Sequence, residues 1–265
     1  MTTPRGIIGV IHLPAMPGDP RHDGAGGFDD VLAFALQDAE ALVEGGVDGL
    51  IVENFGSAPF PKGSEGDRLP PHQVAFLTRV VTECRARFDV AVGVNCLRND
   101  APAAIGVAAA SGADFIRVNV HTGAYVTDQG VIEGEAYRTL RYRKALDAVD
   151  VAILADVLVK HAAPLADIDP EDATKDCVQR GLADAVIVTG QATGAPVTPE
   201  FLERVRDAAG GVPVLVGSGL SPDNAAELMA LCDGAIVGTY FKEGGEVHNP
   251  VDVDRVRRLV ELVRQ

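Results

Sequence analysis

The sequence predicts a parallel (β/α)₈ barrel, the TIM-barrel fold, formed by a single domain over residues 1–265. Eight short runs of β-branched and aliphatic residues alternate with helix-length segments, which is the pattern of this fold. One strand pattern recurs as Asp89-Val-Ala-Val-Gly-Val, Asp150-Val-Ala-Ile-Leu-Ala and Gly211-Val-Pro-Val-Leu-Val. The length of 265 residues is close to the roughly 250 residues typical of the fold.

The apolar runs place the eight strands, and turn residues place the helices between them. Pro or Asp begins several helices, and Gly ends several, as the preferences for helix termini predict. The predicted strands are residues 7–11, 49–53, 90–95, 115–120, 151–156, 185–189, 214–217 and 235–238. The predicted helices are residues 29–44, 71–88, 100–111, 134–148, 170–180, 199–209, 222–231 and 252–264.

The charge and the cysteines exclude several classes of protein. A net charge of −15 disfavours binding to nucleic acid or to anionic membranes, which needs clustered Lys and Arg. The four cysteines lack C-x-x-C spacing, so a zinc knuckle or redox pair is not indicated. The N-terminal apolar run is too short for a signal peptide or membrane span. We therefore expect a cytoplasmic protein without membrane insertion, with homo-oligomers left open.

Three of the loops that follow strands are long: residues 13–28, 54–70 and 122–133. Active sites of these barrels lie at the carboxyl ends of the strands, and long loops in compact domains are usually functional. We expect all three to cover one cavity.

Alternation along the strands predicts a polar cluster at the same end of the barrel. In the fourth strand Ile116 and Val118 should pack on helices, so Arg117 points inward, with room supplied by Gly93. The full inward set is Glu53, Asn95, Arg117, Asn119, His121 and Asp156. These groups suit proton transfer on a small molecule, with Glu53 and Asp156 as acid and base. The alternative is an internal ion-pair network that only stabilises packing.

Two further chemistries remain open at this end. His12 and His161, with His121, Glu53 and Asp156, contain the ligand types of a divalent metal site, although no H-x-H or H-x-x-x-H pair is present. Neither a metal nor any other cofactor is the favoured expectation. Lys160 is a candidate for a Schiff base with a carbonyl substrate, disfavoured because it is expected on a loop outside a dry pocket.

Glycines follow the last strands, where such barrels commonly bind phosphate through backbone N–H groups and a short helix. The loop after the sixth strand, Thr189 to Gly194, is a further candidate wall. The alternative is that these glycines only form tight turns. The predicted phosphate-binding residues are Gly190, Gly217, Ser218, Gly219, Gly238 and Thr239.

Five segments at the predicted strand ends resemble the BtpA/SgcQ family. They are Val10-Ile-His-Leu-Pro-Ala-Met-Pro-Gly18, Val52-Glu-Asn-Phe-Gly-Ser-Ala-Pro-Phe60, Gly93-Val-Asn-Cys-Leu-Arg-Asn-Asp100, Phe115-Ile-Arg-Val-Asn-Val-His-Thr-Gly-Ala124 and Ala155-Asp-Val-Leu-Val-Lys-His161. The resemblance implies a barrel similar to those that bind ribulose phosphate and related compounds. It carries no established reaction, and the family name derives from a role in the accumulation of photosystem I proteins.

Two functions are therefore compared. The favoured one is an enzyme, a lyase, isomerase or glycosidic-bond-cleaving barrel, acting on a small phosphorylated sugar or nucleoside-like metabolite. The alternative is a non-catalytic BtpA-like factor for assembly or stability of a membrane protein complex such as photosystem I.

Overall fold

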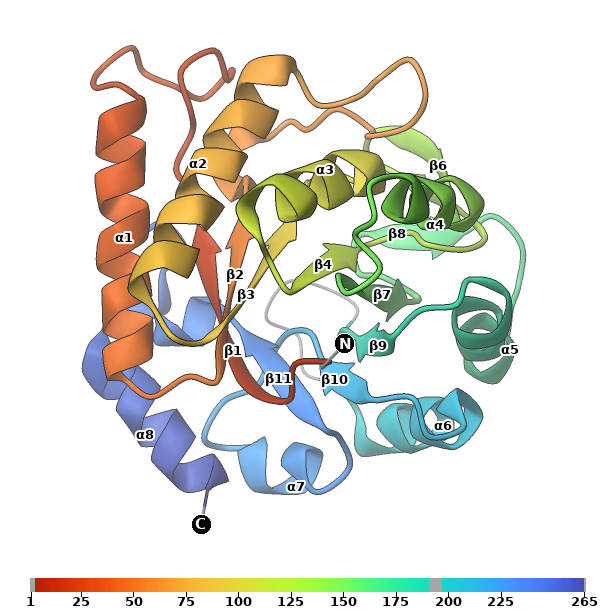
Figure 1. Ribbon diagram of the computed structural model, residues 1–265. Helices are drawn as coiled ribbons and strands as arrows, with labels where there is room; N and C mark the ends of the chain where they lie inside the picture. Colours follow the sequence, from red (N-terminus) through yellow and green to blue (C-terminus); the bar gives the residue numbers. More distant parts are fainter. Residues whose placement is uncertain (1–2, 191–196, 265) are drawn as a thin grey trace.

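Eight parallel strands close a barrel in the order β1-β11-β10-β9-β7-β4-β3-β2, in a computed structural model that describes residues 3–190 and 197–264. Helices surround the strands (Figure 1), so the predicted (β/α)₈ barrel is confirmed. The barrel strands are β1 (Gly6–His12), β2 (Gly49–Glu53), β3 (Ala91–Asn95), β4 (Phe115–Val118), β7 (Ala152–Val157), β9 (Ala185–Val188), β10 (Val214–Val216) and β11 (Gly234–Val237).

The helices follow the predicted order with shorter ends in places. They are α1 (Phe28–Glu44), α2 (Pro71–Arg87), α3 (Ala101–Ser111), α4 (Ala136–Ala145), α5 (Pro170–Lys175), α6 (Pro199–Ala209), α7 (Ala225–Met229) and α8 (Val253–Val263). Short helical turns are η1 (Phe55–Ser57), η2 (Asp176–Arg180), η3 (Thr239–Phe241) and η4 (Glu243–Gly245), of which η2 is a π-helical continuation of α5. The start of α7 was predicted too early, because Ser221 N–H bonds the Asn224 side chain in a turn before the helix.

Side chains alternate between two cores, as the strand pattern predicted. One core fills the barrel interior with Ile8, Val10, Ile51, Phe115, Ala152, Leu154, Ala185, Ile187, Leu215 and Ile236. The other lies between strands and helices and includes Ile116 and Val118. Arg117 therefore points inward, between Ile116 and Val118 that point outward.

The space beside Gly93, predicted to give room to Arg117, is used by a different side chain. A Cβ at Gly93 would lie 2.2 Å from the Phe115 ring, so the space left by Gly93 is occupied by that ring. A Cβ at Gly217 would lie 3.4 Å from Nη2 of Arg117 and 2.3 Å from the Ile187 side chain. Glycine at position 217 therefore avoids a collision with Ile187 and Thr189, while the guanidinium would stand at ordinary contact distance from a Cβ there.

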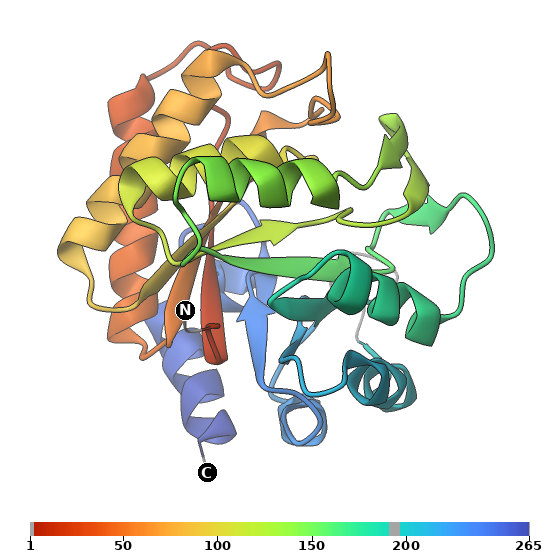
Figure 2. The ribbon, with the colours of Figure 1, turned by 45° about the vertical axis from the view of Figure 1, so that its right-hand side comes forward.

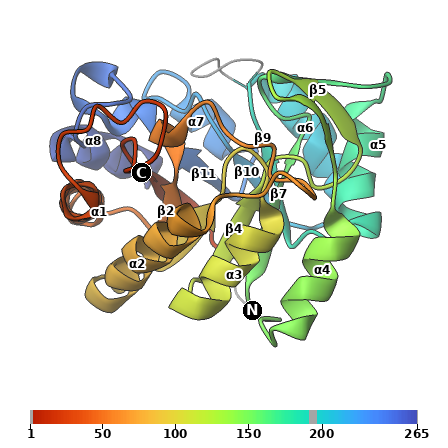
Figure 3. The ribbon, with the colours of Figure 1, turned by 90° about the horizontal axis from the view of Figure 1, so that it is seen from above.

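The third long loop folds into structure that the sequence did not predict. β5 (Ala124–Thr127) and β6 (Gly130–Glu133) form an antiparallel hairpin, and β8 (Ala162–Pro164) pairs with the other edge of β5. Figure 2 shows this small sheet projecting beyond the end of β4. Seen from above, the hairpin and the two other long loops lie at one end of the barrel (Figure 3).

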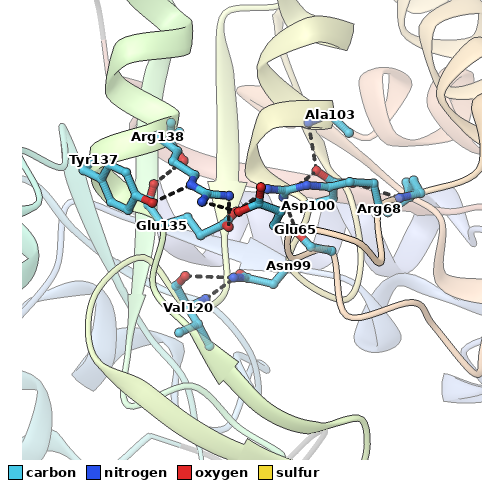
Figure 4. A network of polar contacts seen from close by, with 12 residues as sticks. Glu65, Arg68, Asn99, Asp100, Ala103, Val120, Glu135, Tyr137 and Arg138 are labelled. Carbon is cyan, nitrogen blue, oxygen red and sulfur yellow. Dashed lines mark hydrogen bonds and ion pairs between the residues drawn. The ribbon is translucent and has the colours of Figure 1, made fainter.

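An ion-pair network holds the loop of residues 54–70 against α3 and α4 (Figure 4). Arg68 donates to Oε2 of Glu135 at 2.7 Å and to Oδ1 of Asp100 at 3.2 Å. Arg138 pairs with Glu135 at 3.3 Å and also with Glu65 of the loop. Asp100 additionally accepts from the Ala103 amide as the predicted N-cap of α3. The loop is therefore fixed to two helices.

Candidate functional site

A cavity of about 760 Å³ opens at the carboxyl ends of the barrel strands. All three long loops reach it, through Arg21, Phe60 and Asp128, so the prediction that they cover one cavity is confirmed. Of the predicted site residues it is lined by His12, Glu53, Asn95, Arg117, Asn119, Lys160, Gly217, Ser218, Gly219, Gly238 and Thr239.

A buried ion cluster forms the floor of this cavity. Arg117 donates from Nε to Oδ1 and from Nη2 to Oδ2 of Asp156, both at 3.1 Å, in the two-pronged geometry that guanidinium and carboxylate favour. Its Nη1 lies 3.4 Å from Oε1 of Glu53, which also accepts from Asn95 Nδ2 at 3.0 Å. The nearby carboxylates raise the pKa of Arg117 against the opposing effect of burial. Arg117 is therefore permanently charged.

The two carboxylates of the cluster differ in access. Both oxygens of Asp156 are occupied, since Oδ2 also accepts from Asn119 Nδ2 at 2.9 Å, and its side chain is 0 % exposed. Asp156 does not line the cavity, so its predicted place at the mouth is wrong: Arg117 lies over it. Oε2 of Glu53, by contrast, has no hydrogen-bond partner among the described residues, and Glu53 lines the cavity. Glu53 is the accessible carboxylate of the pair.

His121 lies outside the cluster, which corrects the prediction that it points inward. β4 ends at Val118, so strand alternation no longer fixes the side chains that follow. Nε2 of His121 lies 2.8 Å from the Gly181 carbonyl oxygen, behind the barrel wall. Asn119 still turns inward, and its buried Oδ1 has no hydrogen-bond partner in the described part of the chain.

His12 stands at the end of β1 against aromatic and glycine neighbours. Its ring meets Phe55 edge-on with centroids 4.7 Å apart, and a Cβ at Gly238 would lie 2.5 Å from Cε1 of His12. Its buried Nδ1 has no hydrogen-bond partner within residues 3–190 and 197–264. Burial, assisted by Lys242 and Lys160, lowers the pKa of His12 well below its usual value. His12 is thus a neutral ring at the cavity wall.

We expect acidification to destabilise the protein through this histidine. Below the unfolded-state pKa of about 6.5 the unfolded chain takes up a proton at His12 while the folded chain does not. The free energy of unfolding should therefore fall as the pH drops from 7.5 to 5, by up to about 1.4 kcal/mol per pH unit for one such histidine. His12→Gln should flatten this slope in urea unfolding measured across the range. An identical slope in both proteins would contradict the assignment.

The glycine loops after β10 and β11 present polar groups to the opposite wall. Among the described residues, the buried Oγ of Ser218 has no hydrogen-bond partner, and the amides of Ser218, Gly219 and Thr239 have no acceptor. Gly219 has φ = 78°, which favours glycine. The helix after β11 is a three-residue 3₁₀ turn, η3, so its dipole adds little.

Gly190 is buried and is not among the described residues that line the cavity. The rest of the candidate wall, residues 191–194, lies outside the described residues.

Several lining residues were missed by the sequence reasoning. Arg98 donates from Nη2 to the Lys160 carbonyl oxygen at 3.0 Å, and Phe55, Phe60 and Arg21 add apolar and basic surface. All lie beyond strand ends, where no periodicity applies. Arg98 stands within one of the segments that carry the family resemblance, which was the available signal.

The proposed metal ligands do not converge. In residues 3–190 and 197–264, no three His, Cys, Asp or Glu side chains are arranged to hold a metal ion. Within the same ranges, no helix has the length and apolar character needed to cross a membrane.

The fold and the cavity define a (β/α)₈-barrel protein with a polar pocket at the carboxyl ends of its strands. A model of the BtpA family matches residues 3–265. The chain is 46 % identical over 259 residues to the photosystem I biogenesis protein BtpA of Synechocystis, covering 98 % of this chain and 88 % of that protein. It is also 46 % identical to an uncharacterized protein of Thermococcus kodakarensis, over 98 % of this chain and 95 % of that one. The chain belongs to the BtpA family.

Solved structures with similar folds are more distant in sequence. N-(5'-phosphoribosyl)anthranilate isomerase from Pyrococcus furiosus matches with a TM-score of 0.56 at 14 % identity, covering 98 % of both chains. A KDPGal structure matches with a TM-score of 0.57 at 13 % identity, covering 100 % of this chain and 95 % of that one. At such identities the likeness shows the fold alone.

Proposed function

We propose that this protein is an enzyme that acts on a small phosphorylated sugar or nucleoside-like metabolite by general acid–base chemistry. The reaction class is lyase, isomerase or glycosidic-bond cleavage. The observation that carries the proposal is the carboxylate of Glu53, which lines the cavity, is held through Oε1 by Asn95 and Arg117, and has an Oε2 that accepts from no described residue. A fixed carboxylate with one open oxygen is suited to take a proton from a bound ligand.

The charges around the cavity support an anionic ligand. Although the chain carries a net charge of −15, the cavity lining has four basic side chains, Arg21, Arg98, Arg117 and Lys160, against the two carboxylates Glu53 and Asp128. Arg117 is already paired with Asp156 and Glu53, so the remaining cations are available to a ligand. Together with the open amides of Ser218, Gly219 and Thr239, they supply donors for a phosphate group.

A glycine substitution tests the phosphate part of this proposal. Gly219→Ala places a Cβ on a residue with φ = 78° beside the open amides, and we expect it to weaken binding of ribose 5-phosphate about tenfold. Isothermal titration calorimetry measures the change. Gly219→Ala is preferred to Gly219→Val, because the branched valine side chain would strain this turn more. It is also preferred to changes at Gly217, because a Cβ there would collide with Ile187.

Gly112→Ala is the matched control. Gly112 caps α3 with φ = 73°, and a Cβ there meets nothing within 4 Å, so it carries the same backbone strain away from the cavity. Equal loss of affinity in both variants, or none in either, would remove the phosphate site from the proposal.

A second candidate function rests on the name of one relative. The 46 % identical Synechocystis protein is a photosystem I biogenesis protein, which favours a non-catalytic factor for assembly or stability of a membrane protein complex. Expression of this chain in Synechocystis lacking that protein separates the two functions. Restoration of photosystem I by wild type and by Glu53→Gln alike would favour the assembly factor.

A further inference from the structure

The backbone of Lys160 is fixed at the cavity wall from two sides. Its amide donates to Oγ1 of Thr189 at 3.1 Å, and its carbonyl oxygen accepts from Nη2 of Arg98 at 3.0 Å. These contacts tie the turn after β7 to the end of β9 and to the loop after β3. Lys160 lines the cavity and is partly buried, so the expectation that it lies on a loop outside the pocket is wrong.

The turn that carries Lys160 has an uncommon backbone. Leu158 has φ = 50° and His161 has φ = 58°, left-handed conformations that side-chain-bearing residues rarely adopt. Such conformations cost free energy and persist only where the surrounding structure imposes them, which is most often at functional sites. The strained turn connects β7 to β8 and leaves the Lys160 side chain on the cavity side.

The amine of Lys160 combines burial with the lack of a partner among the described residues. Its Nζ has no hydrogen bond or ion pair to a described residue, whereas Lys242 pairs with Asp38 and Lys175 lies 3.4 Å from Asp172. Burial, with a further contribution from the Arg117 charge, lowers the pKa of Lys160. A lowered pKa increases the fraction of neutral amine, which is the nucleophilic form.

We propose that Nζ of Lys160 forms a Schiff base with the carbonyl carbon of a phosphorylated aldehyde or ketone bound in this cavity. The neutral amine adds its lone pair to the carbonyl carbon, and the oxygen takes a proton to give a carbinolamine. The hydroxyl group then takes a further proton and leaves as water, and the nitrogen lone pair forms the C=N bond of the protonated imine. Glu53, whose charge interacts with Lys160 and whose Oε2 is open, is placed to relay these protons.

This inference rests on the proposed function for its phosphate and narrows the substrate class. The ligand is an open-chain carbonyl compound with its phosphate at the other end, facing Ser218 and Gly219. Once formed, the protonated imine withdraws electrons from the neighbouring carbon and lowers the barrier to breaking a C–H or C–C bond there. Glu53 would accept the released proton, which comes from carbon when a C–H bond breaks and from the hydroxyl group of the departing carbon when a C–C bond breaks.

Reductive trapping tests the covalent step. The protein is incubated with dihydroxyacetone phosphate and sodium borohydride, then analysed by intact mass and peptide mapping. We expect an adduct with the mass of the ketone, less one water and plus two hydrogens, on Lys160. The other lysines, Lys62, Lys144, Lys175 and Lys242, should stay unmodified, and Lys160→Arg should lose the adduct while Lys144→Arg keeps it.

The wild-type map decides the outcome even if a Lys160 variant fails to fold. Absence of an adduct on Lys160, or even labelling across the exposed lysines, overturns the proposal. Dihydroxyacetone without phosphate provides the second arm. If it labels Lys160 as efficiently as the phosphorylated compound, the Schiff base stands and the phosphate part of the proposed function falls. If calorimetry shows phosphate binding but Lys160 stays unlabelled, the phosphate part of the proposed function stands and the Schiff base is ruled out.

Discussion

Arg117→Met is expected to lower the free energy of unfolding by about 3–5 kcal/mol, the cost typical of removing one partner from a buried ion pair. The reason is that Glu53 and Asp156 would remain buried without their shared cation, and the side chains of Arg117 and Asp156 are only 5 % and 0 % exposed. Urea denaturation at pH 7.5, followed by circular dichroism, measures the change. A loss below about 1 kcal/mol would mean that the two carboxylates take up protons or water at little cost.

Arg85→Met is the matched control for this measurement. Arg85 lies 2.9 Å from Asp114, but both side chains are 35 % exposed. Solvent screens such a pair, so its loss should cost no more than about 1 kcal/mol. The difference between the two variants isolates the effect of burial.

Glu53→Gln is expected to reduce turnover by about 10²–10⁴-fold, the range for loss of a general acid or base. Mass spectrometry first identifies a phosphorylated compound that the wild type converts. Turnover of both proteins is then measured on that compound. Glutamine keeps the size of the side chain and a carbonyl oxygen for Asn95, while Asp156 continues to hold Arg117. Binding of ribose 5-phosphate should therefore change little.

Glu133→Gln, which removes an exposed carboxylate on β6, should leave turnover unchanged. Full activity of Glu53→Gln would remove Glu53 as the proton-transfer group. Loss of activity together with loss of folded signal would leave the role of Glu53 to be tested by Glu53→Asp, which shortens the side chain but keeps its charge.

The sequence predicted most of the barrel because the strands are short and their alternation is regular. β2 was placed without error, and the alternation of side chains along the strands was enough to assign Glu53, Asn95 and Arg117 to the interior. The same reasoning failed for His121, because β4 ends three residues earlier and side chains do not alternate regularly outside a strand.

Contacts between distant segments lay beyond the sequence pattern. β5 pairs with β8, more than thirty residues further along the chain, and neither strand is apolar enough to stand out. Asp156 was placed on the correct face, but whether Arg117 covers it depends on a rotamer. The strained turn at Lys160 likewise leaves no periodic signal.

The ion cluster on the floor of the cavity also makes the two walls of the cavity electrostatically different. Arg117 contributes one positive charge, and Glu53 and Asp156 contribute two negative charges, so the floor carries a net charge of 1 − 2 = −1. The open amides and Ser218 lie on another wall, after β10 and β11. We expect an anionic group to be repelled by the first surface and attracted by the second, so that a ligand charged at one end would enter in one of its two orientations. Its uncharged end would then lie against Glu53.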